Sequence, residues 1–172
     1  MYYADARAKW LIAHDPALRE AIVALLGPEA YLPDGTYNRA FVSERVFRDS
    51  ASLAALNALV HPAVERDSQA WHDEQAAKGA RYTWKEAALM VESGGHRFLD
   101  ALIAVTAPEA LRIQRVVQRD GLSEAAVRAR MGSQLPESEK VALADYVVVN
   151  DGTRLLLPQV LAIHRKILGL GA

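Results

Sequence analysis

Short apolar segments alternate along this chain with longer segments of helical periodicity. Segments of strand length that are rich in branched or aromatic residues predict strands at Arg81–Met90, Leu102–Thr106 and Tyr146–Val149. Residues 1–4 have the composition of the last part of a further strand. Because strands alternate with helices, the pattern predicts an α/β fold with a parallel sheet covered by helices on both faces.

Helical patterns occupy most of the chain between these strands. The predicted helices are Ala6–Ala13, Pro16–Leu26, Asn38–Phe47, Ser50–Lys78, Pro108–Asp120, Ser123–Met131 and Leu155–Leu168. Ser50 and Ser123 are predicted as N-caps, because a serine hydroxyl accepts a hydrogen bond from the first turn. We expect the longest helix to break at His61 and Pro62, since proline fits a first helical turn.

No linker, repeat or low-complexity tract divides the chain, so the sequence predicts one domain over residues 1–172. Residues 112–140 differ in composition, because arginines are frequent and large apolar residues are few after Val127. We expect this segment to be a mobile part of the domain.

Composition and charge exclude several classes of protein. The 20 Lys and Arg residues stand against 21 Asp and Glu residues, so the positive field of a nucleic-acid-binding protein is missing. With 0 cysteines, the chain has no disulfide, zinc-thiolate site or cysteine nucleophile. No apolar run approaches the roughly 18 residues of a membrane span, and the N-terminus has no signal-peptide pattern. We therefore expect a cytoplasmic protein without a membrane segment.

Asp5 directly follows the presumed strand residues Tyr2 and Tyr3. The carboxyl ends of parallel strands are where open α/β sheets bind their ligands. A carboxylate at that position suits accepting a hydroxyl proton or holding magnesium. The alternative is that Asp5 only caps the helix predicted to begin at Ala6.

The arginines at positions 112, 115 and 119 have helical spacing, so a helix would present them along one face. Guanidinium groups bind phosphoryl oxygens in a fixed two-pronged geometry, which makes such a row suitable for phosphate recognition. A solvated helix face is the alternative interpretation.

Three further residues stand at predicted element boundaries. His61 suits donation to a phosphate or hydroxyl, or satisfies a neighbouring carbonyl. Glu92 ends the apolar stretch 87–91 at a predicted strand terminus, before a glycine-containing turn, and a surface acid beside a loop is the alternative. Asn150 follows the last strand, where an ordinary turn is the alternative. The chain contains no G-x-x-x-x-G-K-[ST] loop and no G-x-G-x-x-G fingerprint. From the residues alone, no reaction can be named.

The order and spacing of these motifs resemble those of dephospho-coenzyme A kinases over essentially the whole chain. The matching segments are Y-Y-A-D at 2–5, L-N-A-L-V-H-P at 56–62, A-L-M-V-E at 88–92, R-I-Q-R-V-V-Q-R-D-G-L-S at 112–123, the pair Arg130 and Gln134, A-D at 144–145 and N-D-G at 150–152. Each motif is weak alone, but together and in register they are specific.

The resemblance implies a P-loop kinase fold with helices on both faces of a parallel sheet and a helical lid at 112–140. The implied reaction moves the γ-phosphoryl group of ATP, with Mg²⁺, to the 3'-hydroxyl of dephospho-coenzyme A. The implied residues are Asp5, Arg115 and Arg119 for catalysis, His61, Arg39 and Glu92 for the acceptor, and Asn150 and Arg130 for the nucleotide. No metal-ligating side chain is assigned, and Asp5 is expected to face the arginines across a cleft.

The sequence also departs from the family pattern. Tyr3 stands where many members have an aspartate, so the acid-base role falls on Asp5 alone; Arg112 and Ala88 replace a glutamine and a proline. The family's first strand and phosphate-binding loop are absent from the 172 residues. Because that strand lies in the middle of the sheet, two neighbouring strands should lack a pairing partner here. We expect the gene to encode the loop upstream.

Two other functions are compatible with the same motifs. One is a non-catalytic module that binds coenzyme A-type nucleotides without the ATP site. The other is a different small-molecule kinase of the same fold, such as one that phosphorylates a nucleoside monophosphate.

Overall fold

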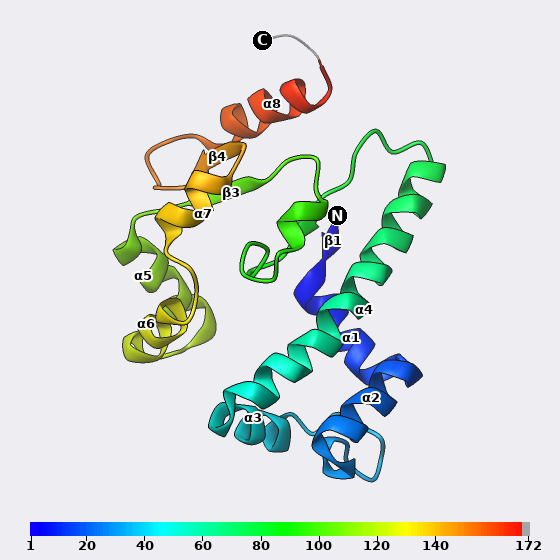
Figure 1. The fold of residues 1–172 in the computed structure, drawn as a ribbon. Coiled ribbons are helices and arrows are strands. Elements are labelled where there is room, and N and C mark those ends of the chain that lie inside the picture. The colour runs from blue at the N-terminus through cyan, green and yellow to red at the C-terminus, as the bar shows by residue number, and fades with distance from the viewer. Residues whose placement is uncertain (170–172) are drawn as a thin grey trace. The chain divides into compact units, whose positions relative to one another are not determined.

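The computed structural model describes residues 1–169, without the side chains of Phe47 and Arg48. The chain separates into two compact units, Met1–Ala88 and a second unit that begins at Leu89 (Figure 1). The single domain and the mobility of residues 112–140 stay predictions.

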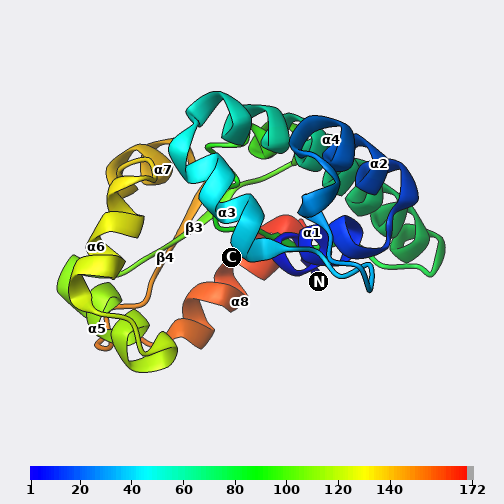
Figure 2. The same cartoon turned by 90° about the horizontal axis from the view of Figure 1, so that it is seen from below.

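The first unit is mainly helical and is organised around its longest helix. Its elements are β1 (Tyr2–Tyr3), α1 (Ala4–His14), α2 (Pro16–Leu26), the 3-10 helix η1 (Pro28–Ala30), α3 (Arg39–Arg48), α4 (Ser50–Ala77) and β2 (Lys85–Glu86). Helices α1, α2 and α3 all pack against α4, as Figures 1 and 2 show. Their buried faces form one hydrophobic core that includes Tyr2, Leu11, Ile22, Val42 and Val64.

Helix α4 begins one residue away from the predicted cap. Asp49, and not Ser50, is the N-cap, because its carboxylate accepts hydrogen bonds from the amides of Ala51 (3.0 Å) and Ser52 (3.2 Å). A carboxylate with two oxygens satisfies two of the amides that a helix start leaves unpaired. Ser50 is therefore the first helical residue.

The predicted break of α4 at His61 and Pro62 is wrong, since the helix is continuous from Ser50 to Ala77 with Pro62 inside it. An internal proline removes one backbone hydrogen bond and costs about 3 kcal/mol or more. Val60, Ala63 and Val64 on either side of it are all buried in the core. Packing of this face against the neighbouring helices explains why the helix persists.

Strand β2 is much shorter than the predicted strand Arg81–Met90. It pairs in parallel with β1 only at Tyr2↔Lys85 and Tyr3↔Glu86. Beyond that point β1 has turned into helix α1, so no ladder partner remains for the residues after Glu86. Residues 88–94 form turns instead, and the expectation that Glu92 ends a strand is therefore wrong.

The second unit contains a parallel strand pair and several helices. Its elements are the 3-10 helix η2 (Gly95–Phe98), β3 (Ile103–Thr106), α5 (Glu109–Asp120), α6 (Glu124–Gly132), α7 (Glu137–Leu143), β4 (Tyr146–Val149) and α8 (Leu156–Ile167). The predicted strands at β3 and β4 are confirmed, with a register from Ile103↔Tyr146 to Thr106↔Val149. Ser123 caps α6 as expected, because its hydroxyl accepts from the Ala126 amide.

Both strand pairs are parallel and are joined through helices, which confirms the predicted α/β class. Among the described residues, β2 pairs only with β1 and β3 only with β4. The edge position of β3 is visible in Val105, which is 65% exposed although its cross-strand neighbour Val148 is 6% exposed. No helix among residues 1–169 is long and apolar enough to cross a membrane.

Candidate active site

Asp5 lies in the first turn of α1 and projects from a helix that begins at Ala4. The N-cap position belongs to Tyr3, so the interpretation of Asp5 as the cap of a helix starting at Ala6 is wrong. The side chain is exposed. No described residue forms a hydrogen bond or an ion pair with its carboxylate, which therefore keeps its acceptor capacity for a substrate.

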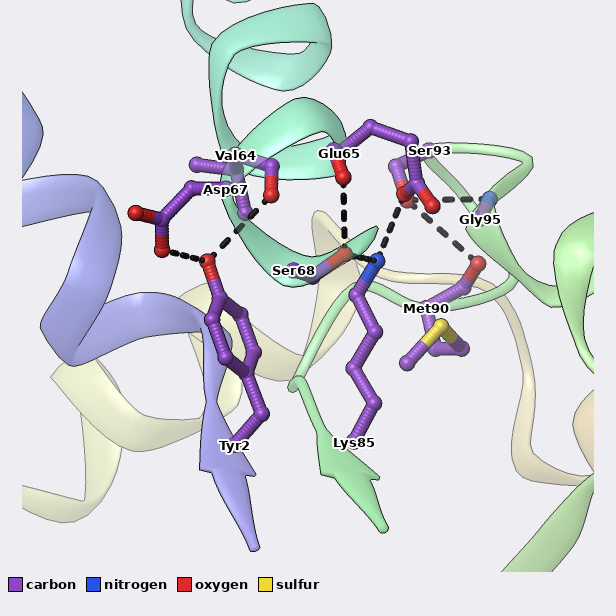
Figure 3. A network of polar contacts seen from close by, with 9 residues as sticks. All are labelled: Tyr2, Val64, Glu65, Asp67, Ser68, Lys85, Met90, Ser93 and Gly95. Atoms are coloured by element: carbon purple, nitrogen blue, oxygen red, sulfur yellow. Dashed lines mark hydrogen bonds and ion pairs between the residues drawn. The ribbon is translucent and has the colours of Figure 1, made fainter. Parts of the chain in front are cut away.

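A partly buried group of polar contacts fixes the backbone on both sides of Asp5. The Tyr2 hydroxyl donates to Asp67 Oδ2 on α4 (2.6 Å), and the Val64 carbonyl oxygen lies 3.2 Å away (Figure 3). From the other side, Arg7 donates to the same carboxylate through Nε (2.9 Å) and Nη2 (2.6 Å). Strand β1 and the first turn of α1, which contains Asp5, are thus tied to one residue of α4.

In this contact, the pKa of Asp67 is lowered and that of Tyr2 is raised. The hydrogen bonds from Arg7, together with the one from Tyr2, hold the pKa of Asp67 below its ordinary value, although burial opposes this. Burial, followed by the bond to Asp67, raises the pKa of the Tyr2 hydroxyl. Asp67 is therefore a carboxylate and Tyr2 a neutral donor near neutral pH.

A second contact ties β2 to the same helix. Lys85 Nζ donates to Glu65 Oε2 (2.5 Å) and to Ser68 Oγ (2.9 Å), as Figure 3 shows. The Lys85 side chain is 12% exposed, so this is one of the more enclosed ion pairs of the chain. Strands β1 and β2 are consequently both anchored on α4.

His61 and Arg39, predicted for the acceptor, are both exposed, on α4 and at the start of α3. Within the described residues, no hydrogen bond or ion pair joins either of them to Asp5. Their role in substrate binding stays a prediction.

The first unit also has an open groove that the sequence did not indicate. Its volume is about 580 Å³, and its lining residues are Arg19, Val23, Pro28, Glu29, Tyr31, Leu32, Pro33 and Asn38. The Arg19 guanidinium lies 4.3 Å from the centre of the Tyr31 ring and donates to the Gly35 carbonyl (3.0 Å). The guanidinium is thus already engaged by a ring and a carbonyl.

In the second unit, the predicted arginine row lies on α5, and one of its members meets another predicted residue. Arg115 Nη1 donates to the backbone carbonyl oxygen of Asn150 (2.8 Å), and the backbone N–H of Asn150 donates to the backbone carbonyl of Thr106 (2.8 Å). These contacts join the helix to the carboxyl ends of β3 and β4. The structure therefore brings Arg115 and Asn150 together at the edge where ligands of such sheets bind.

Glu137, at the start of α7, occupies the same edge. Its carboxylate forms an ion pair with Arg112 Nη2 (2.5 Å), and it accepts hydrogen bonds from the Thr106 hydroxyl and from the Ala107 amide (3.3 Å). Arg112 is consequently engaged by protein, and Glu137 is a residue that the sequence analysis missed.

Arg119 and Arg130 share one carboxylate. Arg119 donates to Asp120 through Nε (2.7 Å) and Nη2 (3.1 Å), while Arg130 Nη1 lies 3.7 Å from Asp120 Oδ2. The Arg119 side chain is 72% exposed and that of Arg130 is 57% exposed. The hydrogen bonds from Arg119 lower the pKa of Asp120. Two predicted site residues are thus held near one another by an exposed acid.

Glu92 contacts the arginine-rich segment. Its Oε1 accepts from the Leu135 amide (3.1 Å) and from Lys140 Nζ (2.6 Å). Burial raises the pKa of the Glu92 carboxyl, but the bonds from Lys140 and from backbone amides outweigh this and hold it below its ordinary value. The acceptor-binding role of Glu92 stays a prediction.

Three acidic residues of these contacts were not singled out from the sequence. Asp120 stands inside the 112–123 motif, which was a usable signal. Asp67 and Glu137 carry no local signal, because the partners of Asp67 lie 60 or more residues away along the chain and those of Glu137 lie 25 to 31 residues away. Across residues 1–169, no group of three or more His, Cys, Asp or Glu side chains could hold a metal ion.

The chain is similar to known proteins over most of its length. The model of a family described as dephospho-CoA kinase matches residues 2–155. A dephospho-CoA kinase of Salinibacter ruber is 42% identical over 153 residues, which cover 89% of this chain and 77% of the relative. One of Porphyromonas gingivalis is 35% identical over 164 residues, covering 95% of this chain and 79% of the relative.

Solved structures extend the comparison to the fold. The crystal structure of TT1252 from Thermus thermophilus superposes with a TM-score of 0.80 at 32% identity, covering 99% of this chain and 84% of that protein. A dephospho-CoA kinase from Campylobacter jejuni, with a TM-score of 0.66 at 23% identity, covers 98% of this chain and 85% of its own and supports the fold alone.

Proposed function

This chain belongs to the dephospho-CoA kinase family, which catalyses the final step of coenzyme A biosynthesis with ATP as phosphate donor, and we propose how its own residues serve that reaction. In the proposed reaction, the 3'-hydroxyl oxygen of dephospho-coenzyme A bonds to the γ-phosphorus of ATP. The bond to the bridging oxygen breaks, ADP leaves, and the hydroxyl proton passes to a protein base.

Asp5 is the proposed base. Its carboxylate is exposed and has no partner among the described residues, which leaves both oxygens available to orient the hydroxyl and accept its proton. General-base catalysis of this kind contributes about 10² to 10⁴ in rate. The single observation that carries the proposal is this unpartnered acid in the first turn of α1, inside a segment that the family model matches.

Arg115, Arg119 and Arg130 are the proposed phosphate ligands. Arg119 and Arg130 form exposed ion pairs with Asp120, and exposed pairs of this kind contribute little to stability because solvent screens them. A triphosphate carries more charge and more acceptor oxygens than one carboxylate, so it replaces Asp120 at little cost. Arginine contacts to a departing phosphoryl group are worth about 10³ to 10⁵ in rate. Asn150, next to Arg115, would approach the adenine.

In this proposal, Mg²⁺ binds together with ATP. Magnesium is usually held by one or two carboxylates plus substrate phosphates. Residues 1–169 contain no cluster of three metal-ligating side chains, so they do not form a metal cage of their own. None of the steps assigned to Asp5 or the arginines depends on the ion.

The substrate is tested with the full gene product and a panel of phosphate acceptors. We expect ATP-dependent phosphorylation of dephospho-coenzyme A, and no comparable rate with AMP, CMP or pantothenate. A preference for a nucleoside monophosphate would replace the proposal with the other kinase function. Binding of dephospho-coenzyme A in calorimetry without any turnover would favour the non-catalytic module.

A further inference from the structure

We infer that Asp67 is a positioning residue that holds the Asp5 carboxylate in place for the acceptor hydroxyl; this inference rests on the proposed role of Asp5. Asp67 touches neither substrate nor Asp5 in the proposed arrangement. It acts through Tyr2 and Arg7, which stand before and after Asp5 in the chain and both donate to it.

Asp5 needs such support because it has none of its own. Its side chain is exposed and makes no hydrogen bond or ion pair with a described residue. The position of the carboxylate is therefore set by the backbone of the β1–α1 junction. Catalytic groups lose effect when that backbone shifts, since a displacement of about 1 Å can cost about 10² in rate.

The contacts of Asp67 lie at both ends of this junction. Tyr2 belongs to β1 and is 3% exposed, with its ring 5.6 Å from that of Trp71 on α4. Arg7 ends the first turn of α1, and its guanidinium also lies 4.4 Å from the centre of the Trp10 ring. Because each donor is itself packed against an aromatic ring, the two hold the junction in one orientation relative to α4.

The geometry of the carboxylate suits this task. Oδ2 accepts from the Tyr2 hydroxyl at 2.6 Å and from Arg7 Nε at 2.9 Å, and Oδ1 accepts from Arg7 Nη2 at 2.6 Å. A two-pronged contact with arginine restricts rotation as well as distance. Asn at position 67 would keep the shape of the side chain but lose one acceptor and the charge.

The other strand of the pair is fixed to the same helix. Lys85 of β2 reaches Glu65 and Ser68, on the turn of α4 next to Asp67. Since β2 pairs with β1 at Tyr2↔Lys85, both strands have α4 as their common support. Helix α4 therefore aligns the junction from two directions, and only the contact of Asp67 brackets Asp5.

The test is a double-mutant cycle on the full gene product, with kcat and the KM for dephospho-coenzyme A measured separately. We expect Asp67→Asn to lower kcat about tenfold while KM changes less than about twofold, as for a group that acts on the transition state alone. In the Asp5→Asn background, the same change should have no further effect on kcat, because nothing is left to position.

Two companion variants separate positioning from stability. Tyr2→Phe removes only the hydroxyl, keeps the ring in the core and should lower kcat about threefold, again only when Asp5 is present. Glu74→Gln, which removes an exposed ion pair with Lys78 on the same helix, should leave kcat and melting temperature unchanged. If Asp67→Asn does not fold, the Tyr2→Phe cycle decides alone.

Equal losses of kcat in the two backgrounds, or an unchanged kcat in Asp67→Asn, would overturn the inference and leave the proposed function intact. Full activity of the Asp5→Asn variant by itself would instead remove the proposed base. The two failures are thus distinguishable in one set of measurements.

Discussion

The acceptor side and the donor side of the proposed reaction are held by opposite kinds of polar contact. Around Asp5, the donors that bind Asp67 are Tyr2, which is 3% exposed, and Arg7, whose side chain is 38% exposed. Around the proposed phosphate ligands, the partner Asp120 holds arginines that are 72% and 57% exposed. Enclosed contacts resist exchange, whereas exposed pairs exchange with little loss. The comparison indicates a fixed acceptor site and arginines that are free to change partner.

The largest effect is expected from Arg119→Ala, which removes a proposed phosphate ligand. The kcat should fall by about 10³ or more, because the departing phosphoryl group loses a charge partner. Arg128 is the matched control, since it is exposed on the neighbouring helix and pairs with Glu124 and Glu109. Steady-state kinetics of Arg119→Ala and Arg128→Ala compare the two positions. Equal losses of kcat in the two variants would contradict a special role for Arg119.

The contacts of Asp67 and of Asp120 should also contribute differently to the unfolding free energy. Asp67→Ala leaves the Tyr2 hydroxyl and the Arg7 guanidinium without their partner, and such a loss costs about 1 to 3 kcal/mol of unfolding free energy. Asp120→Ala, on an exposed pair, should leave the unfolding free energy unchanged. Urea denaturation of the two variants measures both values. Similar destabilisation by the two changes would contradict the distinction between fixed and exchangeable contacts.

The fixed contact predicts a pH dependence of stability. The folded state lowers the pKa of Asp67 from its ordinary value of 3.8, so its contribution is present above that pH. This contribution is lost as pH falls through the lower folded value, because the unfolded state then binds the proton more readily. Asp67→Asn should therefore flatten the acid side of a plot of unfolding free energy against pH, from pH 3.8 downward. An unchanged slope would show that other carboxylates account for the acid sensitivity.

The smallest effect is expected from Asp120→Asn on the donor side. Removing the charge that competes with phosphate for Arg119 and Arg130 should lower the KM for ATP about twofold, in line with the small energy of exposed pairs. The KM for dephospho-coenzyme A should not change. A raised KM for ATP would indicate instead that Asp120 orients the arginines for binding.

The sequence predicted those parts of the fold that depend on local pattern. Strands β3 and β4, the cap at Ser123 and the helical row at Arg112 and Arg115 follow from periodicity and residue type over a few positions. The α/β class followed from the alternation of strands and helices, and the family followed from the order of the motifs.

Predictions that depended on distant partners were wrong or absent. Strand β2 ends early because β1 stops pairing at Tyr3, and α4 passes through Pro62 because its flanks are buried in the core. The partnership of Asp67 with Tyr2 and Arg7 spans 60 residues or more, so no local signal could reveal it.

The role of Asp5 is tested most directly by the rate of a single turnover with dephospho-coenzyme A and ATP both saturating. In the full gene product, Asp5→Asn should slow phosphoryl transfer by about 10² to 10⁴ while dephospho-coenzyme A still binds in calorimetry. The variant Asp73→Asn, at an exposed aspartate of α4 that accepts from Gln69, should react like the unchanged protein. A single-turnover rate in Asp5→Asn equal to that of the unchanged protein would contradict the account.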